Sequence, residues 1–342
     1  MKVLVSLGAA YLCLASLAAP RSHAADFPKA VTVYIGTNTG GGYDAYGRLV
    51  ARNLSRFLPG QPTVAVSNMP GAAGLALTNW MYNVAPRDGA VIGLASNHNA
   101  YAPLLGMKQA RFDPRAFGWI GSMGRMTDVV AVWHATPHKD VDAMFRSQIT
   151  LSSTSSGDGA IVPNLLNELI GTRFKVVTGY PDSANAFHAV ERGEVDGTVD
   201  MALESLEAMH GDLLNAGKLR ILMQVALNPS PRLAGVPFVM DYVKSDENRE
   251  ILKLLLAKLE YGRPFMAPPG VPEDIVERYR AAFQAMSVDP RFLEEARRER
   301  IDIGFGGGAG LQAMVRQFYQ TPTAIVSASR DALKRAGQAG LD

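Results

Sequence analysis

The chain has 342 residues, with 34 basic and 32 acidic side chains and a single cysteine, Cys13. So small a charge imbalance argues against a protein that binds nucleic acid or a membrane surface. The length fits two domains of medium size.

The first 24 residues have the features of a secretory signal peptide. Lys2 precedes an apolar stretch, and small residues stand three and one positions before a cleavage predicted after Ala24. Pro20 and Arg21 interrupt the apolar stretch, which argues against a retained membrane anchor, and no later segment reaches the roughly 18 apolar residues of a spanning helix. Two of the 34 basic residues and the only cysteine, Cys13, leave with this segment, so 32 basic residues remain against 32 acidic ones. We therefore expect an exported, periplasmic protein that has no disulfide and no cysteine-ligated metal.

Strand-like and helix-like segments alternate after the signal. Glycine and proline turns, such as Pro59-Gly60 and Pro70-Gly71, separate them. The expected elements are strands at 31–35, 63–67 and 91–95 and helices at 46–58 and 72–84. This β-α-β-α-β order with short connections predicts a parallel sheet with helices packed on it.

The pattern restarts after about residue 128 and predicts a second α/β unit. Its expected strands lie at 129–133, 149–152, 174–178, 195–199 and 219–225, and its helices at 141–146, 161–170, around 187–192 and at 203–216. The C-terminal third contains a helix that starts at Pro272, with Glu273 and Asp274 in its first turn, where the helix dipole favours acids. A glycine run at 305–310 then leads into a closing helix from Leu311.

The predicted strand ends carry six loops, of which five are rich in glycine, serine, threonine, asparagine or aspartate. Their sequences are TNTGGGYD (37–44), NMPGAAG (68–74), SNHNA (96–100), STSSGDG (153–159), GYPDSA (179–184) and DMALE (200–204). Ligands of parallel α/β sheets bind beyond the carboxyl ends of the strands, at helix N-termini. Two facing units would thus form an anion-binding cleft. We predict no cofactor, because the sequence has no cofactor motif. We also predict no metal site, because His134 and His138 flank Pro137 and do not share a helical face.

The glycine loop Gly40–Gly42 has two other interpretations. A phosphate loop needs a lysine and a hydroxyl residue after its last glycine, and a dinucleotide loop needs a third spaced glycine; neither is present here. The loop could also be a tight strand-to-helix turn without a ligand. Asp44, in the first turn of the next helix, could cap that helix or contact a ligand, and Arg48 could pair with it one turn on.

The order of several motifs resembles one known family. GGGYD, GRLVARNL, SNMPGAAG, APRDGAVIGLAS and MAPPGVPEDIVERYRAAF follow one another along essentially the whole mature chain. Together they resemble the periplasmic solute receptors of the tripartite tricarboxylate transporters. The resemblance implies a two-lobed type II periplasmic binding fold, each lobe a mostly parallel sheet flanked by helices. Lobe 1 would comprise 25–128 and 247–342, and lobe 2 129–246.

The resemblance also implies which residues hold the ligand. In the family a small carboxylate binds between the lobes to the glycine loop and to hydroxyl and backbone donors. By position these are Gly41, Gly42, Tyr43, Asp44, Ala72, Ala73, Gly74, Ser155, Ser156, Gly157, Tyr180, Asp182 and Asp200. Thr37 and Asn38, which stand where the family has a proline-rich lead, and Asn97 complete the predicted site. Tyr43 replaces a small hydroxyl residue of the family, so we expect it to favour an aromatic or bulkier acid.

The predicted function is that of a monomeric receptor, not an enzyme. It would deliver a di- or tricarboxylate or an aromatic acid to the integral-membrane subunits of such a transporter. One alternative is an exported hydrolase or isomerase that uses the serine-rich loop 152–157, although no G-x-S-x-G motif surrounds it. Another is an input-binding protein for a sensor.

Overall fold

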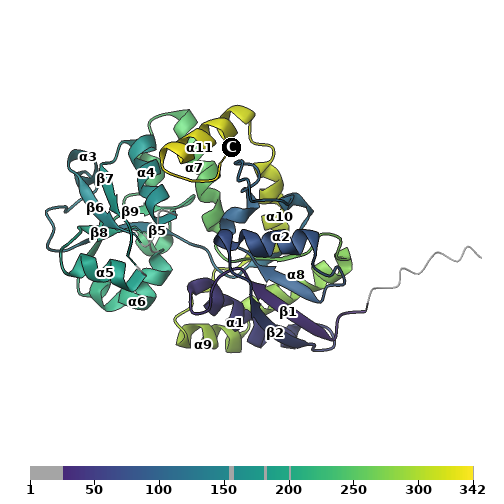
Figure 1. Cartoon of the computed structure of the whole chain (residues 1–342). Coiled ribbons are helices and arrows are strands. Elements are labelled where there is room, and N and C mark those ends of the chain that lie inside the picture. The colour runs from purple at the N-terminus through teal and green to yellow at the C-terminus, as the bar shows by residue number, and fades with distance from the viewer. Residues whose placement is uncertain (1–25, 154–157, 181–182, 200–201, 342) are drawn as a thin grey trace, which may run out of the picture.

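The computed structural model describes residues 26–153, 158–180, 183–199 and 202–341. Two lobes are visible, each built on its own β-sheet (Figure 1). The sheet of the first lobe has the strand order β11-β4-β10-β3-β1-β2. Its strands are β1 (Ala30–Ile35), β2 (Thr63–Asn68), β3 (Val91–Leu94), β4 (Gly118–Ser122), β10 (Pro264–Ala267) and β11 (Gly306–Gly307).

Parallel pairing brings the ligand-side ends of three strands together. β1 pairs in parallel with β2 and β3, and Ile35 lies opposite both Asn68 and Leu94. The loops that follow these three strands therefore begin at one edge of the sheet, as expected for a binding edge. On the other side of β3 the strands β10, β4 and β11 are antiparallel to their neighbours.

Helices cover both faces of the first sheet. They are α1 (Gly42–Leu54), α2 (Leu75–Asn83), α8 (Glu273–Ser287), α9 (Pro290–Arg298) and α10 (Gly308–Phe318). Side chains alternate along the strands. Phe265 of β10 thus packs edge-on against Phe283 of α8 at 5.0 Å, whereas its neighbour Met266 belongs to the apolar cluster that contains Leu77 of α2 and Leu311 of α10.

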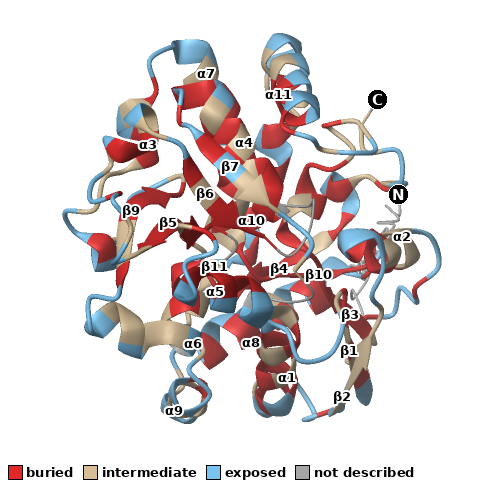
Figure 2. Cartoon of the chain, turned by 60° about the vertical axis from the view of Figure 1, so that its left-hand side comes forward, coloured by how far each residue is buried: buried red, intermediate tan, exposed pale blue. Residues whose placement is uncertain are grey.

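The second lobe has the strand order β7-β6-β8-β5-β9. β6 is parallel to β7 and β8, whereas β5 is antiparallel to β8 and β9. The strands lie buried between the helices (Figure 2). The elements are β5 (Asp128–Trp133), β6 (Ile149–Ser152), β7 (Phe174–Val177), β8 (Gly197–Thr198), β9 (Leu219–Val225), α3 (Ala143–Arg146), α4 (Asp158–Ile170), α5 (Ser183–Glu191) and α6 (Leu203–Asn215).

Two helices from the C-terminal part of the chain pack against α4 of the second lobe. They are α7 (Asp246–Leu256) and α11 (Thr323–Arg335), which lie beside α4 in Figure 1. Asn248 Nδ2 donates to Leu169 O at 2.8 Å, and Asn164 Nδ2 donates to Ala336 O at 2.9 Å. The C-terminal part of the chain therefore contacts the second lobe directly through these two helices.

The prediction of a two-lobed α/β fold is confirmed, and each β-branched run predicted as a strand contains one. Both sheets are mixed, however, where mostly parallel sheets were expected. The antiparallel strands β4 and β10 were not predicted, because GWIGS and PFMA contain only one β-branched residue between them. The division of the chain at 128 and 246 stays a prediction. Among the described helices, none is long and apolar enough to cross a membrane.

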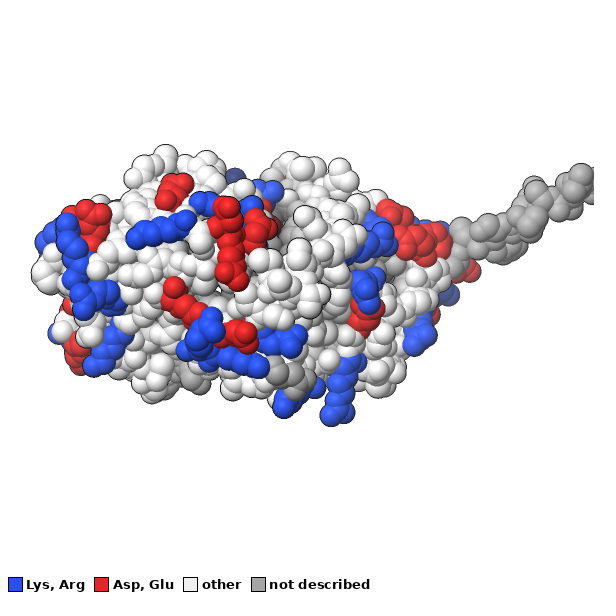
Figure 3. All heavy atoms as spheres, turned by 90° about the horizontal axis from the view of Figure 1, so that it is seen from above, with Lys and Arg blue, Asp and Glu red and all other residues white. Residues whose placement is uncertain are grey.

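Acidic and basic side chains are interspersed on the face that Figure 3 shows. Elsewhere in the chain, charged side chains form ion pairs along one helix, such as Arg278 with Asp274 at 3.2 Å, or between helices, such as Arg335 with Glu168. The face carries no broad patch of a single sign, which agrees with the balanced composition.

Candidate functional site

A cavity of about 610 Å³ lies between the lobes beside the glycine loop. We call it the glycine-loop cavity. The first lobe contributes Gly40–Gly42 and Arg263, and the second contributes Ala184 of α5 and Glu204 of α6. Its volume falls within the range of small-molecule sites, about 300–1,000 Å³.

A second cavity of about 210 Å³ lies next to it, and we call it the central cavity. Tyr43 and Asn97 line it from the first lobe, and Val199 and Ala202 line it from the second. Met126, on the segment that joins β4 to β5, lines both cavities. Residues of both lobes thus line two neighbouring cavities of the cleft.

Asp44, the third residue of α1, holds the glycine loop in place. Its buried carboxylate accepts hydrogen bonds from Gly40 N, Arg48 Nε and Asn68 Nδ2, each at 2.9 Å. Asn68 Nδ2 also donates to Thr37 O at 2.9 Å, so β2 is tied to both ends of the loop. Burial alone would raise the pKa of the Asp44 carboxyl, but the hydrogen bonds from Arg48, Gly40 and Asn68 outweigh it and hold the pKa below its usual value. These contacts favour a supporting role for Asp44 and confirm its pairing with Arg48.

Tyr43 lies at the edge of the central cavity, but its ring is already engaged. Its hydroxyl accepts a hydrogen bond from Asn97 N at 3.1 Å. The guanidinium carbon of Arg263 lies 4.3 Å from the ring centroid. A ligand could therefore reach only the remaining face or an edge of the ring. That Tyr43 favours an aromatic acid stays a prediction.

Arg263 is a buried cation between two aromatic rings. Arg263 is 7% exposed. Its guanidinium carbon lies 4.3 Å from the ring centroid of Tyr43 and 5.0 Å from that of Tyr46. Both distances are those of cation–π contacts. The Tyr46 hydroxyl donates a hydrogen bond to Asp302 O. Burial raises the pKa of Tyr46 to about 12, so its side chain stays neutral at physiological pH.

The guanidinium of Arg263 is only partly satisfied. Nη1 donates to Gly262 O and Met126 Sδ, both at 2.9 Å, whereas the buried Nε has no hydrogen-bond partner. Nη2 lies against the glycine loop, because a Cβ on Gly42 would stand 3.2 Å from it. Within the described residues, no carboxylate is ion-paired with Arg263. A buried cation of this kind beside a glycine loop has the chemistry of an anion site.

Glu204 lines the same cavity from the second lobe. Burial raises the pKa of its carboxyl, and Thr127 N donates to its Oε2 at 3.4 Å. A raised pKa brings the neutral form closer to physiological pH, and this reduces the repulsion that an anionic ligand meets on that side.

The loop after β2 is strained. Gly71, Ala72, Ala73 and Gly74 have φ angles of 135°, 45°, 53° and 84°. Left-handed backbone costs an alanine about 1–2 kcal/mol, and strain of this kind clusters at functional sites. Position 74 requires glycine, because a Cβ there would lie 2.5 Å from Ser96 Oγ. A ligand role for this loop remains a prediction that the strain favours.

Some of the remaining predicted residues are described but line neither cavity. The others lie outside the described residues. Thr37 contributes its carbonyl to the Asn68 hydrogen bond, and Asn38 is exposed. Tyr180 packs beside Val190 and Val195 in the second lobe. Outside the described residues are Ser155, Ser156, Gly157, Asp182 and Asp200. In the part that is described, no three histidine, aspartate or glutamate side chains gather as a metal site would require.

An ion pair crosses the mouth of the cleft. Arg232, which follows β9, pairs with Asp302 of the first lobe at 3.0 Å and with Glu207 of α6. The Arg232 and Asp302 side chains are 40% and 55% exposed, so the pair contributes at most about 1 kcal/mol.

We expect Arg232→Ala to leave the unfolding temperature nearly unchanged and to shift the ligand-free protein towards more open lobes. Small-angle scattering would detect the shift as a larger radius of gyration. The control Arg111→Ala removes an exposed arginine that lines neither cavity of the cleft, and it should leave the radius unchanged. An equal radius in wild type and Arg232→Ala would show that the pair does not hold the lobes.

The fold and the cleft define a class: a two-lobed periplasmic solute-binding protein. The sequence model of the tripartite tricarboxylate transporter family receptor matches residues 47–326, and the chain belongs to this family. No curated protein sequence matches the chain significantly.

Solved structures of this fold superpose on most of the chain. A TctC solute-binding protein from Polaromonas has a TM-score of 0.65 at 15% identity and covers 89% of this chain and 98% of its own. R. palustris Rpa4515 with adipate has a TM-score of 0.63 at 21% identity, and the match covers 91% of this chain and 99% of Rpa4515. MatC from Rhodopseudomonas palustris with bound malate has a TM-score of 0.59 at 19% identity, and the match covers 89% of this chain and 98% of MatC.

Sequence reasoning missed Arg263 and Met126. Arg263 stands in YGRPFMAPP, where a charged residue directly precedes an apolar run that becomes the buried strand β10. A charged side chain at the start of a buried strand needs a partner. The position of Arg263 directly before an apolar run was therefore the sequence signal for a buried cation. Nothing in the sequence indicates that the partners are the rings of Tyr43 and Tyr46, more than 200 residues earlier.

Proposed function

We propose that the protein is an exported periplasmic receptor that binds a small carboxylate between its lobes and delivers it to the membrane subunits of a tripartite tricarboxylate transporter. The observation that carries this proposal is Arg263. Its buried guanidinium faces the glycine loop and has no carboxylate partner among the described residues. A ligand carboxylate would supply the missing charge.

The relatives support this choice of ligand class. Rpa4515 carries adipate and MatC carries malate, and both ligands are dicarboxylates. An acid of either kind would place one carboxylate on the Arg263 guanidinium and on donors of the glycine loop at Gly41 and Gly42. The remaining groups would lie in the central cavity, near Tyr43 and Asn97.

The energetics of this arrangement are adequate. Micromolar affinity requires about 8 kcal/mol. A hydrogen bond to a charged group contributes about 1.5–3 kcal/mol, so two from Arg263 and two from the loop reach that range. Because the guanidinium is desolvated before the ligand arrives, part of the cost of burying charge is already met in the folded protein.

Closure of the lobes follows from where the cavity residues lie. The glycine-loop cavity is lined from both lobes, and a ligand that contacts both favours their closed arrangement. We keep the predicted lobes, 25–128 with 247–342 and 129–246, as part of this proposal. Arg263 then belongs to the first lobe, and Glu204 closes over the ligand from the second.

We further propose that the protein is a receptor only and catalyses no reaction. Family and fold are those of solute-binding receptors. The enzyme alternative makes a different prediction, because a hydrolase or isomerase would convert the bound acid. NMR of the ligand after prolonged incubation with the protein should show unchanged acid, and a new product would favour the alternative.

A screen of carboxylates tests the proposal directly. We expect at least one acid from a panel of acetate, malate, adipate and benzoate to raise the unfolding temperature and to bind in calorimetry. A ligand present at 100 times its Kd stabilises the fold by about 2.7 kcal/mol. Glucose and simple cations are the controls and should have no effect. Stabilisation by glucose or a cation but by no acid would contradict the proposal.

A further inference from the structure

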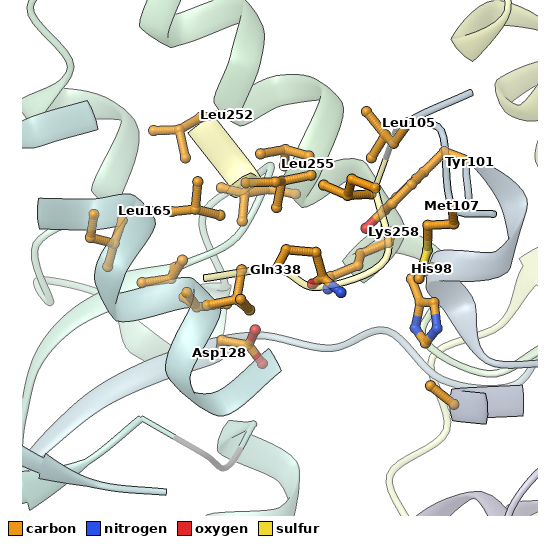
Figure 4. Close-up of a pocket in the computed structure, with 18 residues that line it drawn as sticks. His98, Tyr101, Leu105, Met107, Asp128, Leu165, Leu252, Leu255, Lys258 and Gln338 are labelled. Carbon is orange, nitrogen blue, oxygen red and sulfur yellow. The ribbon is translucent and has the colours of Figure 1, made fainter. Parts of the chain in front are cut away.

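A third cavity lies deeper in the cleft, and its walls are mainly aliphatic. It has a volume of about 310 Å³. Leucines from three helices line it, among them Leu165 of α4 and Leu252 and Leu255 of α7 (Figure 4). Leu333 of α11 and Leu341 near the C-terminus line it as well. We call it the leucine cavity.

A void of this size is unusual in a folded protein. Interiors pack to the density of organic crystals, with few gaps larger than a water molecule. An apolar cavity of about 150 Å³ is already large enough to hold benzene and stays dry without it. The leucine cavity has about twice that volume. Its leucines are buried, with Leu252 1% and Leu255 5% exposed.

The leucine cavity adjoins the central cavity. His98, Asp128, Val162 and Lys258 line both. Figure 4 shows the leucines along one side of the leucine cavity, with Asp128 and His98 on the other. The ionisable side chains His98, Asp128 and Lys258 therefore lie where the two cavities meet, and the leucines lie beyond them, with Tyr101 and Gln338 as the other polar lining residues. Such a site has a polar entrance and an apolar interior.

We propose that the leucine cavity holds the apolar body of the ligand, and that the protein binds monocarboxylic acids with a bulky aliphatic or aromatic body. This inference rests on the proposed carboxylate function and narrows its substrate class. The carboxylate stays on Arg263 and the glycine loop, and the body passes through the central cavity between His98 and Asp128 into the leucine cavity. A dicarboxylate long enough to enter the leucine cavity would place its second charge among leucines, which is unfavourable.

A series of straight-chain monocarboxylates from acetate to decanoate tests this with the wild-type protein. Each methylene that enters the cavity should raise the affinity about fourfold, and the gain should stop once the cavity is full. The heat-capacity change of binding should become more negative along the series. Equal affinity for acetate and octanoate would overturn the inference. Failure of every acid to bind would instead overturn the proposed function itself.

A matched pair of variants locates the apolar body. Leu255→Trp fills the cavity, whereas Leu254→Trp makes the same change at a buried position of α7 that does not line it. We expect Leu255→Trp to lose at least about 10-fold in octanoate affinity and to keep its acetate affinity, and Leu254→Trp to keep both. If folded Leu255→Trp binds octanoate as tightly as the wild type does, the alkyl chain of octanoate does not enter the leucine cavity and the inference is wrong. If Leu255→Trp does not fold, Leu165→Trp tests the same wall from α4.

Discussion

Arg263→Met is expected to weaken binding of the carboxylate at least about 100-fold without destabilising the ligand-free protein. The loss of two charge-assisted hydrogen bonds, about 1.5–3 kcal/mol each, accounts for the weaker binding, since each 1.4 kcal/mol is a factor of ten. Isothermal titration calorimetry with the tightest acid of the panel measures it.

The stability of Arg263→Met separates a binding role from a structural one. The variant loses two cation–π contacts, each about 0.5–1 kcal/mol or more when desolvated. It also removes a buried charge that lacks a carboxylate partner among the described residues, and replacing buried charge by an apolar side chain of similar volume is often neutral or stabilising. The two effects oppose each other, so the unfolding free energy should change by no more than about 1 kcal/mol.

Two further variants control for charge. Arg125→Met removes a guanidinium that lines the same cavity but is 65% exposed and lies 4.0 Å from Glu260. It should change the affinity less than about threefold. Arg263→Lys keeps the charge but loses the planar fork, so it should bind with intermediate affinity. Equal losses in Arg125→Met and Arg263→Met would mean that general electrostatic attraction, and not Arg263, determines the affinity.

The local parts of the site could be predicted from the sequence. A β-branched run followed by three glycines and an amphipathic helix indicates a strand end that faces a helix N-terminus, and the structure has β1, the glycine loop and α1 there. The pairing of Asp44 with Arg48 is an i,i+4 contact and follows from helix geometry. Asn68 ends a neighbouring parallel strand, so its proximity to Asp44 follows once the register of β1 and β2 is known.

The long-range parts could not be predicted. Arg263 reaches the glycine loop only because β10 enters the sheet antiparallel between β3 and β4. A four-residue strand with one proline and no β-branched residue carries no signal for that position. The leucine cavity is equally invisible, because its leucines belong to helices with ordinary apolar faces. A gap between packed helices depends on their relative placement, which amphipathic patterns do not give.

Asp44→Asn is expected to destabilise the protein by about 2–3 kcal/mol at neutral pH. The variant turns an acceptor of three hydrogen bonds into an amide, whose own N–H groups meet the donors of Arg48, Asn68 and Gly40. A hydrogen bond to a charged group contributes about 1.5–3 kcal/mol, and the partial exposure of Gly40 and Arg48 keeps the loss well below the sum of three such bonds. Urea unfolding followed by circular dichroism measures the change. Asp274→Asn is the matched control: this residue also begins a helix and pairs with an arginine four residues on, but its side chain is 42% exposed, so the loss should stay below about 1 kcal/mol.

The pH dependence of this loss identifies the charge as its cause. The pKa of Asp44 is lower in the folded protein than in the unfolded chain, where it is about 3.9. The stabilisation from the ionised carboxylate is therefore fully present above about pH 4 and is lost as the pH falls through the folded value. The difference between wild type and Asp44→Asn should be constant from about pH 8 to pH 5 and should shrink below pH 4. A difference that does not change down to pH 3 would assign the loss to shape and not to charge.

Because the same carboxylate orders the glycine loop, the affinity of the variant for the acid should fall with the stability of the loop, even though Asp44 itself does not face the cavity.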